Sequence, residues 1–208
     1  MKRELDELEV IERYLVLLLG VVDRPIPSRE HVQKELFILS KAYPKASEFL
    51  RFERHYKGPF SPDVSELIEN PSYYVGAFTI DRSGRCSLTE EGRKIYEKIV
   101  QENRENARFK ELLAVMKTIR ELYDRLSKDE LLFLIYASYP EYKERSIFFE
   151  KLLSKRRALA ESLLKKGLIT EKRFEELTSY NNSPKQSRGG SGSSNASITA
   201  RSSPIFRW

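Results

Sequence analysis

Apolar residues that recur every three or four positions run through most of the chain, and they restrict it to a mainly helical fold. The first such stripe predicts a helix from about residue 4 to residue 20, and it consists of Leu5, Leu8, Ile11, Leu15 and Leu18. Two prolines then break the chain at residues 25–27. Ser28 is a suitable N-cap for a second helix, which ends near Tyr43 because a residue before proline avoids the helical region.

The next segments predict a short helix and a hairpin. Residues 49–56 are compatible with a helix or with an extended chain. Ser61 is a predicted N-cap, with Pro62 at the first helical position, for a third helix that ends near residue 70. Residues 77–80 and 85–88 are predicted strands joined by a turn, and Thr89 caps the following helix. Helix, helix, loop, helix, hairpin, helix is the order of a winged-helix domain.

The remaining body of the chain is predicted to be helical throughout. An apolar stripe runs from Phe109 to Leu126, and Ser127 with Glu130 forms a capping box for the next helix. A further helix is expected over residues 148–166, and Thr170 caps a last short one. We therefore expect a mainly α protein with a winged-helix domain over residues 1–100 and a helical C-terminal domain over residues 101–180.

The net charge of +6 and the pI near 9.3 are typical of a nucleic-acid-binding protein. Residues 181–208, however, hold four basic residues and no acidic one, which is two-thirds of the excess. This segment is rich in Ser, Gly and Asn and has no apolar period, so we expect it to be disordered. It is either a native flexible tail or an extension introduced by cloning or a frameshift.

Several protein classes are unlikely on composition. The longest apolar stretch, residues 15–22, is too short to span a bilayer, so we expect no membrane association. The single cysteine, Cys86, forms no internal disulfide, which favours a reducing, cytoplasmic compartment. The bias toward charged residues is typical of proteins from hot environments.

Two motifs carry a family resemblance. The segment KELFIL at residues 34–39, followed by YKGPFSPDV at residues 56–64, resembles a group of uncharacterised bacterial and archaeal winged-helix proteins with an (L/V)QK helix and a YGP(F/Y)SP segment. That group is distantly similar to the Panacea (SocA-like) antitoxin domains. The resemblance covers about residues 8–100, and residues 139–146 are similar to the C-terminal extension of some members.

This chain departs from the motif because Lys57 is inserted between Tyr56 and Gly58. The resemblance implies a regulatory or antitoxin-like module, which is often assumed to bind DNA. It implies no catalytic residues.

The predicted contacts with nucleic acid come from two basic clusters. One lies on the turn of the predicted hairpin and the other on the helix over residues 148–166, and together they comprise Arg82, Arg85, Lys151, Lys155, Arg156 and Arg157. The alternative is that these are ordinary solvated charges. The third helix, which normally enters the major groove, is acidic and has no Lys or Arg, so we expect it to be secondary.

Other candidate sites favour structural roles. The loop over residues 56–61 leads into a helix N-terminus near Lys57 and Arg54, but the Ser61 hydroxyl is expected to satisfy the free N–H groups there. His31 and His55 have no metal-ligand spacing, and Cys86 in a strand is expected to be an inert thiol. We expect no enzyme activity, no cofactor and no metal.

Two functional hypotheses follow from the sequence. In the first, the chain is a winged-helix transcriptional regulator or antitoxin-like protein that binds double-stranded DNA. In the second, it keeps the winged-helix fold but does not bind DNA, and its helical C-terminal half forms a homodimer or captures a toxin-like protein partner.

Overall fold

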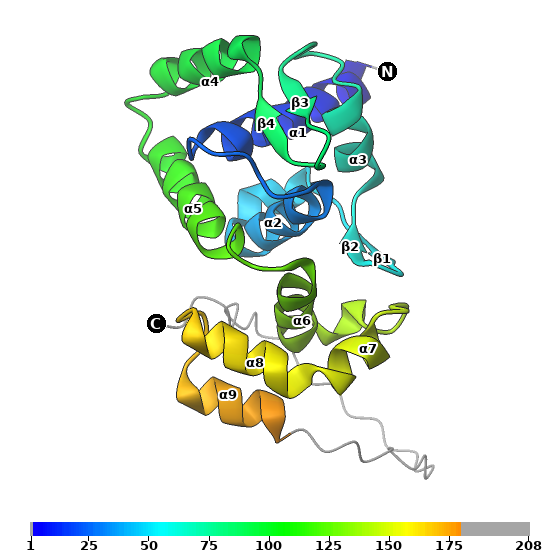
Figure 1. Ribbon diagram of the computed structural model, residues 1–208. Helices are drawn as coiled ribbons and strands as arrows, with labels where there is room; N and C mark the ends of the chain where they lie inside the picture. The colour runs from blue at the N-terminus through cyan, green and yellow to red at the C-terminus, as the bar shows by residue number, and fades with distance from the viewer. Residues whose placement is uncertain (1, 180–208) are drawn as a thin grey trace, which may run out of the picture. The chain divides into compact units, whose positions relative to one another are not determined.

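The computed structural model describes residues 2–179, and this part of the chain is mainly helical with short strands in two antiparallel hairpins (Figure 1). The predicted mainly α class is confirmed. The described part of the chain divides into two compact units, the first ending at Ser154 and the second beginning at Lys155. The predicted tail, residues 181–208, lies outside the described residues. Within residues 2–179, no helix has both the length and the apolar character needed to cross a membrane.

The first unit contains most of the secondary structure. It begins with α1 (Lys2–Gly20), α2 (Arg29–Ala42), the 3-10 helix η1 (Pro44–Glu48), β1 (Glu53–His55) and β2 (Gly58–Phe60). Next come α3 (Pro62–Glu69), β3 (Phe78–Ile80), β4 (Cys86–Leu88) and α4 (Glu90–Glu102). It ends with α5 (Ala107–Tyr123), α6 (Lys128–Ser138), the 3-10 helix η2 (Pro140–Tyr142) and α7 (Phe149–Ser154).

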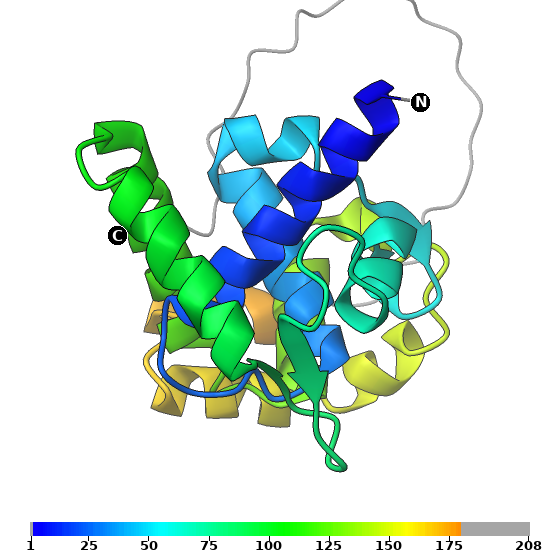
Figure 2. The same ribbon diagram turned by 90° about the horizontal axis from the view of Figure 1, so that it is seen from above.

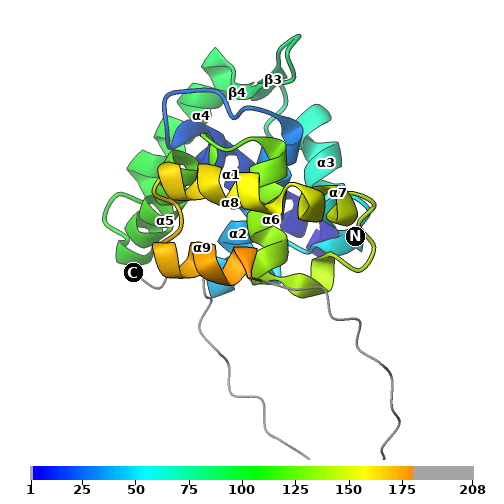
Figure 3. The ribbon, with the colours of Figure 1, turned by 60° about the horizontal axis from the view of Figure 1, so that its bottom comes forward.

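The second unit contains α8 (Arg156–Lys165) and α9 (Glu171–Thr178), which pack side by side (Figure 3). The single helix expected over residues 148–166 is wrong, because the chain leaves the helical conformation at Lys155, where φ is −103° and ψ is 4°. Gly167 closes α8 with a φ of +69°, which is the left-handed conformation predicted for a helix C-terminus.

The predicted N-caps are confirmed, because each side-chain oxygen accepts a backbone N–H from the first turn of its helix. The Oγ of Ser28 lies 3.3 Å from the backbone nitrogen of His31, and the Oγ1 of Thr89 lies 3.0 Å from that of Gly92. Ser127 and Glu130 form the expected capping box at the start of α6. Local sequence signals therefore fix where these helices begin.

Helix α2 lies at the centre of the first unit. Every side chain from His31 to Ser40 is buried, because α3, α5, α6, η1 and β2 all pack around this helix (Figure 1). The ring of Phe37 contacts Phe52, Tyr139 and Tyr142, with ring centroids 4.8–5.4 Å apart. The buried surface is thus wider than the single stripe that periodicity predicts.

The packing of α5 and α6 against α2 bears on domain organisation. The domain boundary expected near residue 100 falls inside the first unit. The division between the two compact units lies in the sequence between residues 154 and 155. Periodicity along one helix does not reveal which distant helix covers its apolar stripe.

The predicted hairpin is present as β3 and β4, with Phe78 opposite Leu88 and Ile80 opposite Cys86. It projects from the body of the first unit (Figure 2, green). Ile26, between α1 and α2, exchanges two backbone hydrogen bonds with Cys86, at 2.8 and 2.9 Å. The connection between the first two helices is therefore joined to the edge of this hairpin.

A fully buried guanidinium joins α5 to α1 and to the connection that follows it. Arg120 Nη1 donates to the carbonyl of Leu18 at 2.6 Å, and Nη2 donates to the carbonyl of Arg24 at 2.6 Å. Its Nε donates to the carboxylate of Asp124 at 3.0 Å. These bonds satisfy carbonyls near and beyond the end of α1 and provide the guanidinium with a counter-charge.

Glu35 on α2 lies beside this cluster and is also fully buried. Its Oε2 is 3.8 Å from Arg120 Nε. Burial, together with the neighbouring Asp124 carboxylate, raises the pKa of Glu35 well above its usual value, although Arg120 opposes the shift. The raised pKa favours the protonated form of Glu35, which leaves Asp124 as the main counter-charge of Arg120.

We predict that Arg120→Ala lowers the free energy of unfolding by about 3–5 kcal/mol, because it removes the buried donor of the Leu18 and Arg24 carbonyls and leaves Asp124 paired only with the partly exposed Arg24. Arg108→Ala, at an exposed position on the same helix, is the matched control and is expected to change stability by less than ~0.5 kcal/mol. Urea denaturation of the full chain measures both. Similar losses in the two variants would contradict a central role for Arg120.

The buried Glu35 also predicts a pH dependence. Because its pKa is higher in the folded than in the unfolded protein, the unfolded chain loses this proton first as the pH rises past about 4.5, and stability falls above that pH. Glu35→Gln is expected to flatten this fall between about pH 5 and pH 8. Urea denaturation at a series of pH values tests this, with the exposed Glu111→Gln as the control. An unchanged slope in Glu35→Gln would rule out the protonated state.

Candidate functional site

The two predicted contact residues on the β3–β4 turn differ in their surroundings. Arg85 Nε donates to the Asp81 carboxylate at 2.8 Å, and this carboxylate also accepts hydrogen bonds from Ser83. The bonds from Ser83 and then Arg85 lower the pKa of Asp81, which stays ionised and balances Arg85. Arg82 is exposed and forms no ion pair within residues 2–179. Only Arg82 therefore offers an unbalanced charge on this turn.

The second predicted cluster is divided between the two compact units. Lys151 is exposed on α7 in the first unit, whereas Lys155, Arg156 and Arg157 begin the second. Arg157 Nε lies 3.1 Å from the Glu161 carboxylate one turn later in α8. These four residues consequently do not lie on one helix, as the sequence suggested.

Helix α3 presents an acidic surface. Asp63, Glu66 and Glu69 are exposed, while Val64, Leu67 and Ile68 are buried against the first unit. Glu69 pairs with Arg29 from α2, and Glu66 accepts a hydrogen bond from the Asn70 side chain at 2.9 Å. The exposed face of this helix contributes no basic side chain.

The two halves of the sequence motif meet in space. Gln33 on α2 bonds twice to the backbone of Ser61, because its Nε2 donates to the Ser61 carbonyl and its Oε1 accepts the Ser61 N–H, each at 2.9 Å. The next residue, Lys34, donates to the carbonyl of Pro59 at 3.0 Å. The glutamine and lysine of the helix therefore hold the GPFS segment against α2.

The inserted Lys57 is one of the two residues that turn the chain between β1 and β2, which pair with His55 opposite Gly58. Gly58 has a φ of +86°, the left-handed conformation that often follows such a turn. A Cβ on Gly58 would lie 2.6 Å from Leu132 Cδ1 on α6, so any other residue would strain the backbone and displace this side chain. The sequence of residues 49–56 is compatible with a helix or an extended chain. Its last residues, Glu53–His55, are extended as β1 because they pair with β2.

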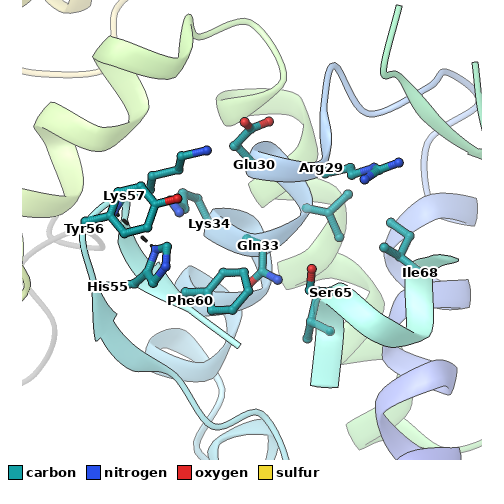
Figure 4. Close-up of a pocket in the computed structure, with 12 residues that line it drawn as sticks. Arg29, Glu30, Gln33, Lys34, His55, Tyr56, Lys57, Phe60, Ser65 and Ile68 are labelled. Atoms are coloured by element: carbon teal, nitrogen blue, oxygen red, sulfur yellow. Dashed lines mark hydrogen bonds between the residues drawn. The ribbon is translucent and has the colours of Figure 1, made fainter. Parts of the chain in front are cut away.

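A pocket of about 280 Å³ opens between α2, the β1–β2 hairpin and α3 (Figure 4). Its polar lining includes charged groups from α2 and from the hairpin, and its apolar lining comes from α2, β2 and α3. The lining residues are Arg29, Glu30, Val32, Gln33, Lys34, His55, Tyr56, Lys57, Phe60, Val64, Ser65 and Ile68. Sequence analysis missed this pocket, although the family motif contains several of its residues.

Lys34 is the most deeply buried basic group of the pocket, with 5% of its surface exposed. Burial lowers the pKa of its ammonium to about 8; Glu30 opposes this shift and Lys57 adds to it. The His55 ring stacks against Phe60 at 4.8 Å and contacts Tyr56 at 4.0 Å. Burial and the two lysines also lower the pKa of His55.

The remaining candidate groups have structural surroundings. The His31 ring hydrogen-bonds with Ser28 Oγ and with the Leu126 carbonyl, each at 2.9 Å. Burial raises the pKa of the Cys86 thiol to about 11. Ser61 caps α3, as expected for the loop beside Lys57, and Arg54 pairs with Glu144. Over the described part of the chain, no three His, Cys, Asp or Glu side chains gather as metal ligands.

Comparisons with protein-family models, with curated proteins and with solved structures gave no match to this chain. Functional inference therefore depends on the geometry and charge of the molecule itself.

We predict that Gln33→Leu lowers the free energy of unfolding by about 1–3 kcal/mol, because it leaves the buried N–H of Ser61 without a partner, while the Ser61 carbonyl keeps the hydrogen bond from the Ser65 N–H. The amide of Ser61 should also exchange its hydrogen faster, which hydrogen-exchange NMR detects. Gln101→Leu, at an exposed position on α4, is the matched control. Unchanged protection of Ser61 in Gln33→Leu would contradict the role assigned to this side chain.

Proposed function

We propose that this chain is a non-catalytic regulatory protein with a winged-helix domain, and that it acts by binding a protein partner in the manner of an antitoxin. The order of elements supports the winged helix. α1, α2 and α3 are followed by the β3–β4 hairpin as the wing, and the Ile26–Cys86 bridge adds a minimal third strand to the wing. The motifs at residues 34–39 and 56–64 support the antitoxin-like class.

The observation that carries the choice of partner is the acidic exposed face of α3. A helix that enters the major groove replaces counterions at phosphates with Lys and Arg side chains. Here the corresponding helix exposes Asp63 and Glu66 instead, which repel a phosphate backbone, and its Glu69 is balanced by Arg29. This face is complementary to a basic protein surface, and charge complementarity favours association with such a partner.

Binding of double-stranded DNA through the wing is the second candidate. It is favoured by one observation, namely that Arg82 is exposed at the end of a projecting hairpin (Figure 2). Lys151, Lys155, Arg156 and Arg157 would supply further phosphate contacts in this candidate. Such binding is sequence-independent for the most part and weakens steeply with salt.

The charge of α3 gives a direct test. We predict that the full-length chain does not bind a random-sequence DNA duplex at micromolar protein and low salt, as measured by fluorescence anisotropy. When the tagged chain is used to capture proteins from an extract of its source cells, we expect it to retain a basic protein. The Glu66→Lys variant should retain at least about fivefold less of this protein. Glu97→Lys on α4 carries the same charge change on another surface and should retain the partner fully.

Two results would contradict this function. One is that the unaltered chain binds the duplex in a salt-sensitive way and that Arg82→Glu abolishes this binding, which would favour the second candidate. The other is equal capture of the basic protein by Glu66→Lys and by the unaltered chain, which would remove α3 from the interface.

A further inference from the structure

We propose that the pocket between α2, the β1–β2 hairpin and α3 binds a small monocarboxylate that carries an apolar group. This site is separate from the proposed partner surface, because Asp63, Glu66 and Glu69 do not line it. Its volume of about 280 Å³ lies at the lower end of ligand pockets, which are ~300–1,000 Å³ for drug-sized molecules. A small ligand is therefore expected.

One end of the pocket is basic. The buried Lys34 ammonium uses one donor for the Pro59 carbonyl, and an ammonium has three. Lys57 approaches from the hairpin, and in residues 2–179 no carboxylate lies within ion-pair distance of either lysine. Figure 4 shows the two lysines and Tyr56 together at this end. A hydrogen-bond acceptor with a negative charge fits these donors.

The basic groups at this end repel one another. Lys57 lowers the pKa of Lys34, and both lysines lower the pKa of His55, in addition to the effect of burial on each group. A bound anion relieves this repulsion and favours the protonated forms. Glu30 is the only acidic residue in the lining, and it is paired with Lys128 of α6 at 2.9 Å.

The apolar lining comes from β2 and α3. Phe60 from β2 stacks on His55 beside the basic end, and Val64 and Ile68 from α3 continue this surface, with Ile68 and the paired Arg29 on the side opposite Lys57 in Figure 4. The pocket thus places an apolar surface next to a basic end. A ligand with a carboxylate at the lysines and a hydrocarbon or aromatic group against Phe60 uses both surfaces.

The charges also distinguish a carboxylate from a phosphate. Arginine binds phosphate well because its guanidinium donates two parallel hydrogen bonds. The one arginine of the lining, Arg29, is paired with Glu69. Inorganic phosphate also has no apolar group to place against Phe60, so the lining favours a carboxylate that carries one.

The experiment uses the full-length protein and phenylacetate as the probe, followed by heteronuclear NMR. Phenylacetate is expected to shift the amide signals of residues 30–34 and 55–60. Lys57→Gln removes an exposed charge without disturbing the core, and it should weaken binding by about fivefold. Lys110→Gln, on the exposed face of α5, is the matched control and should bind as the unaltered chain does.

The charge of the ligand and the titration of Lys34 give two further readouts. Phenylacetamide has the same shape without the charge and should not shift these signals. Affinity for phenylacetate should fall about tenfold from about pH 7 to pH 9, because Lys34 loses its proton over this range while Glu30 stays ionised. His55, whose pKa is lowered, is neutral throughout this range.

Three outcomes would overturn the proposal. The first is the absence of pocket shifts with both phenylacetate and hexanoate at millimolar concentration. The second is equal binding of phenylacetamide, which would show that the basic end plays no part. The third is binding of inorganic phosphate as tight as that of phenylacetate. None of these results depends on α3 binding a protein partner, so this proposal and the proposed function fail separately.

Discussion

The buried guanidinium of Arg120 connects three parts of the first unit that are distant in the chain. It bonds to carbonyls at the end of α1 and beyond it, to Asp124 in the turn after α5, and it lies beside Glu35 of α2. Each of its three nitrogens donates to one of these acceptors, so a charge can be buried at the meeting point of three helices. The position of α2, around which the other elements pack, depends on this cluster and on the aromatic contacts of Phe37.

Helix α2 in turn positions the candidate functional surfaces. Its Gln33 and Lys34 side chains bind the backbone of the GPFS segment, which places the β1–β2 hairpin on one side and starts α3 on the other. The same contacts leave a pocket between these three elements. The motif at residues 34–39 and 56–64 therefore has a structural explanation, and the Lys34 side chain that holds the hairpin also forms part of the basic end of the pocket.

The distribution of charge within the molecule is more informative than its total. Four of the basic residues that produce the +6 lie in residues 181–208, and Arg85 and Arg157 are balanced by neighbouring carboxylates. The exposed face of α3 is acidic. The high pI, taken alone, indicates a nucleic-acid-binding protein, whereas the local charges favour a basic protein partner at α3 and a small anion at Lys34.

The sequence by itself determined the helical class, the helix starts at Ser28, Ser61, Thr89 and Ser127, and the β3–β4 hairpin, because caps, prolines and apolar periods act between residues close in the chain. It also indicated the motif at residues 34–39 and 56–64, but not what the motif builds. Only the tertiary structure decided that α5 and α6 belong with α2, that β1 pairs with β2, that residues 148–166 form two helices, and that Lys34 lines a pocket. Each of these features depends on contacts between residues that are distant in the chain. Burial of Arg120 and Lys34 is tolerated because such contacts provide hydrogen-bond acceptors, and burial of Glu35 raises its pKa, which favours the neutral form.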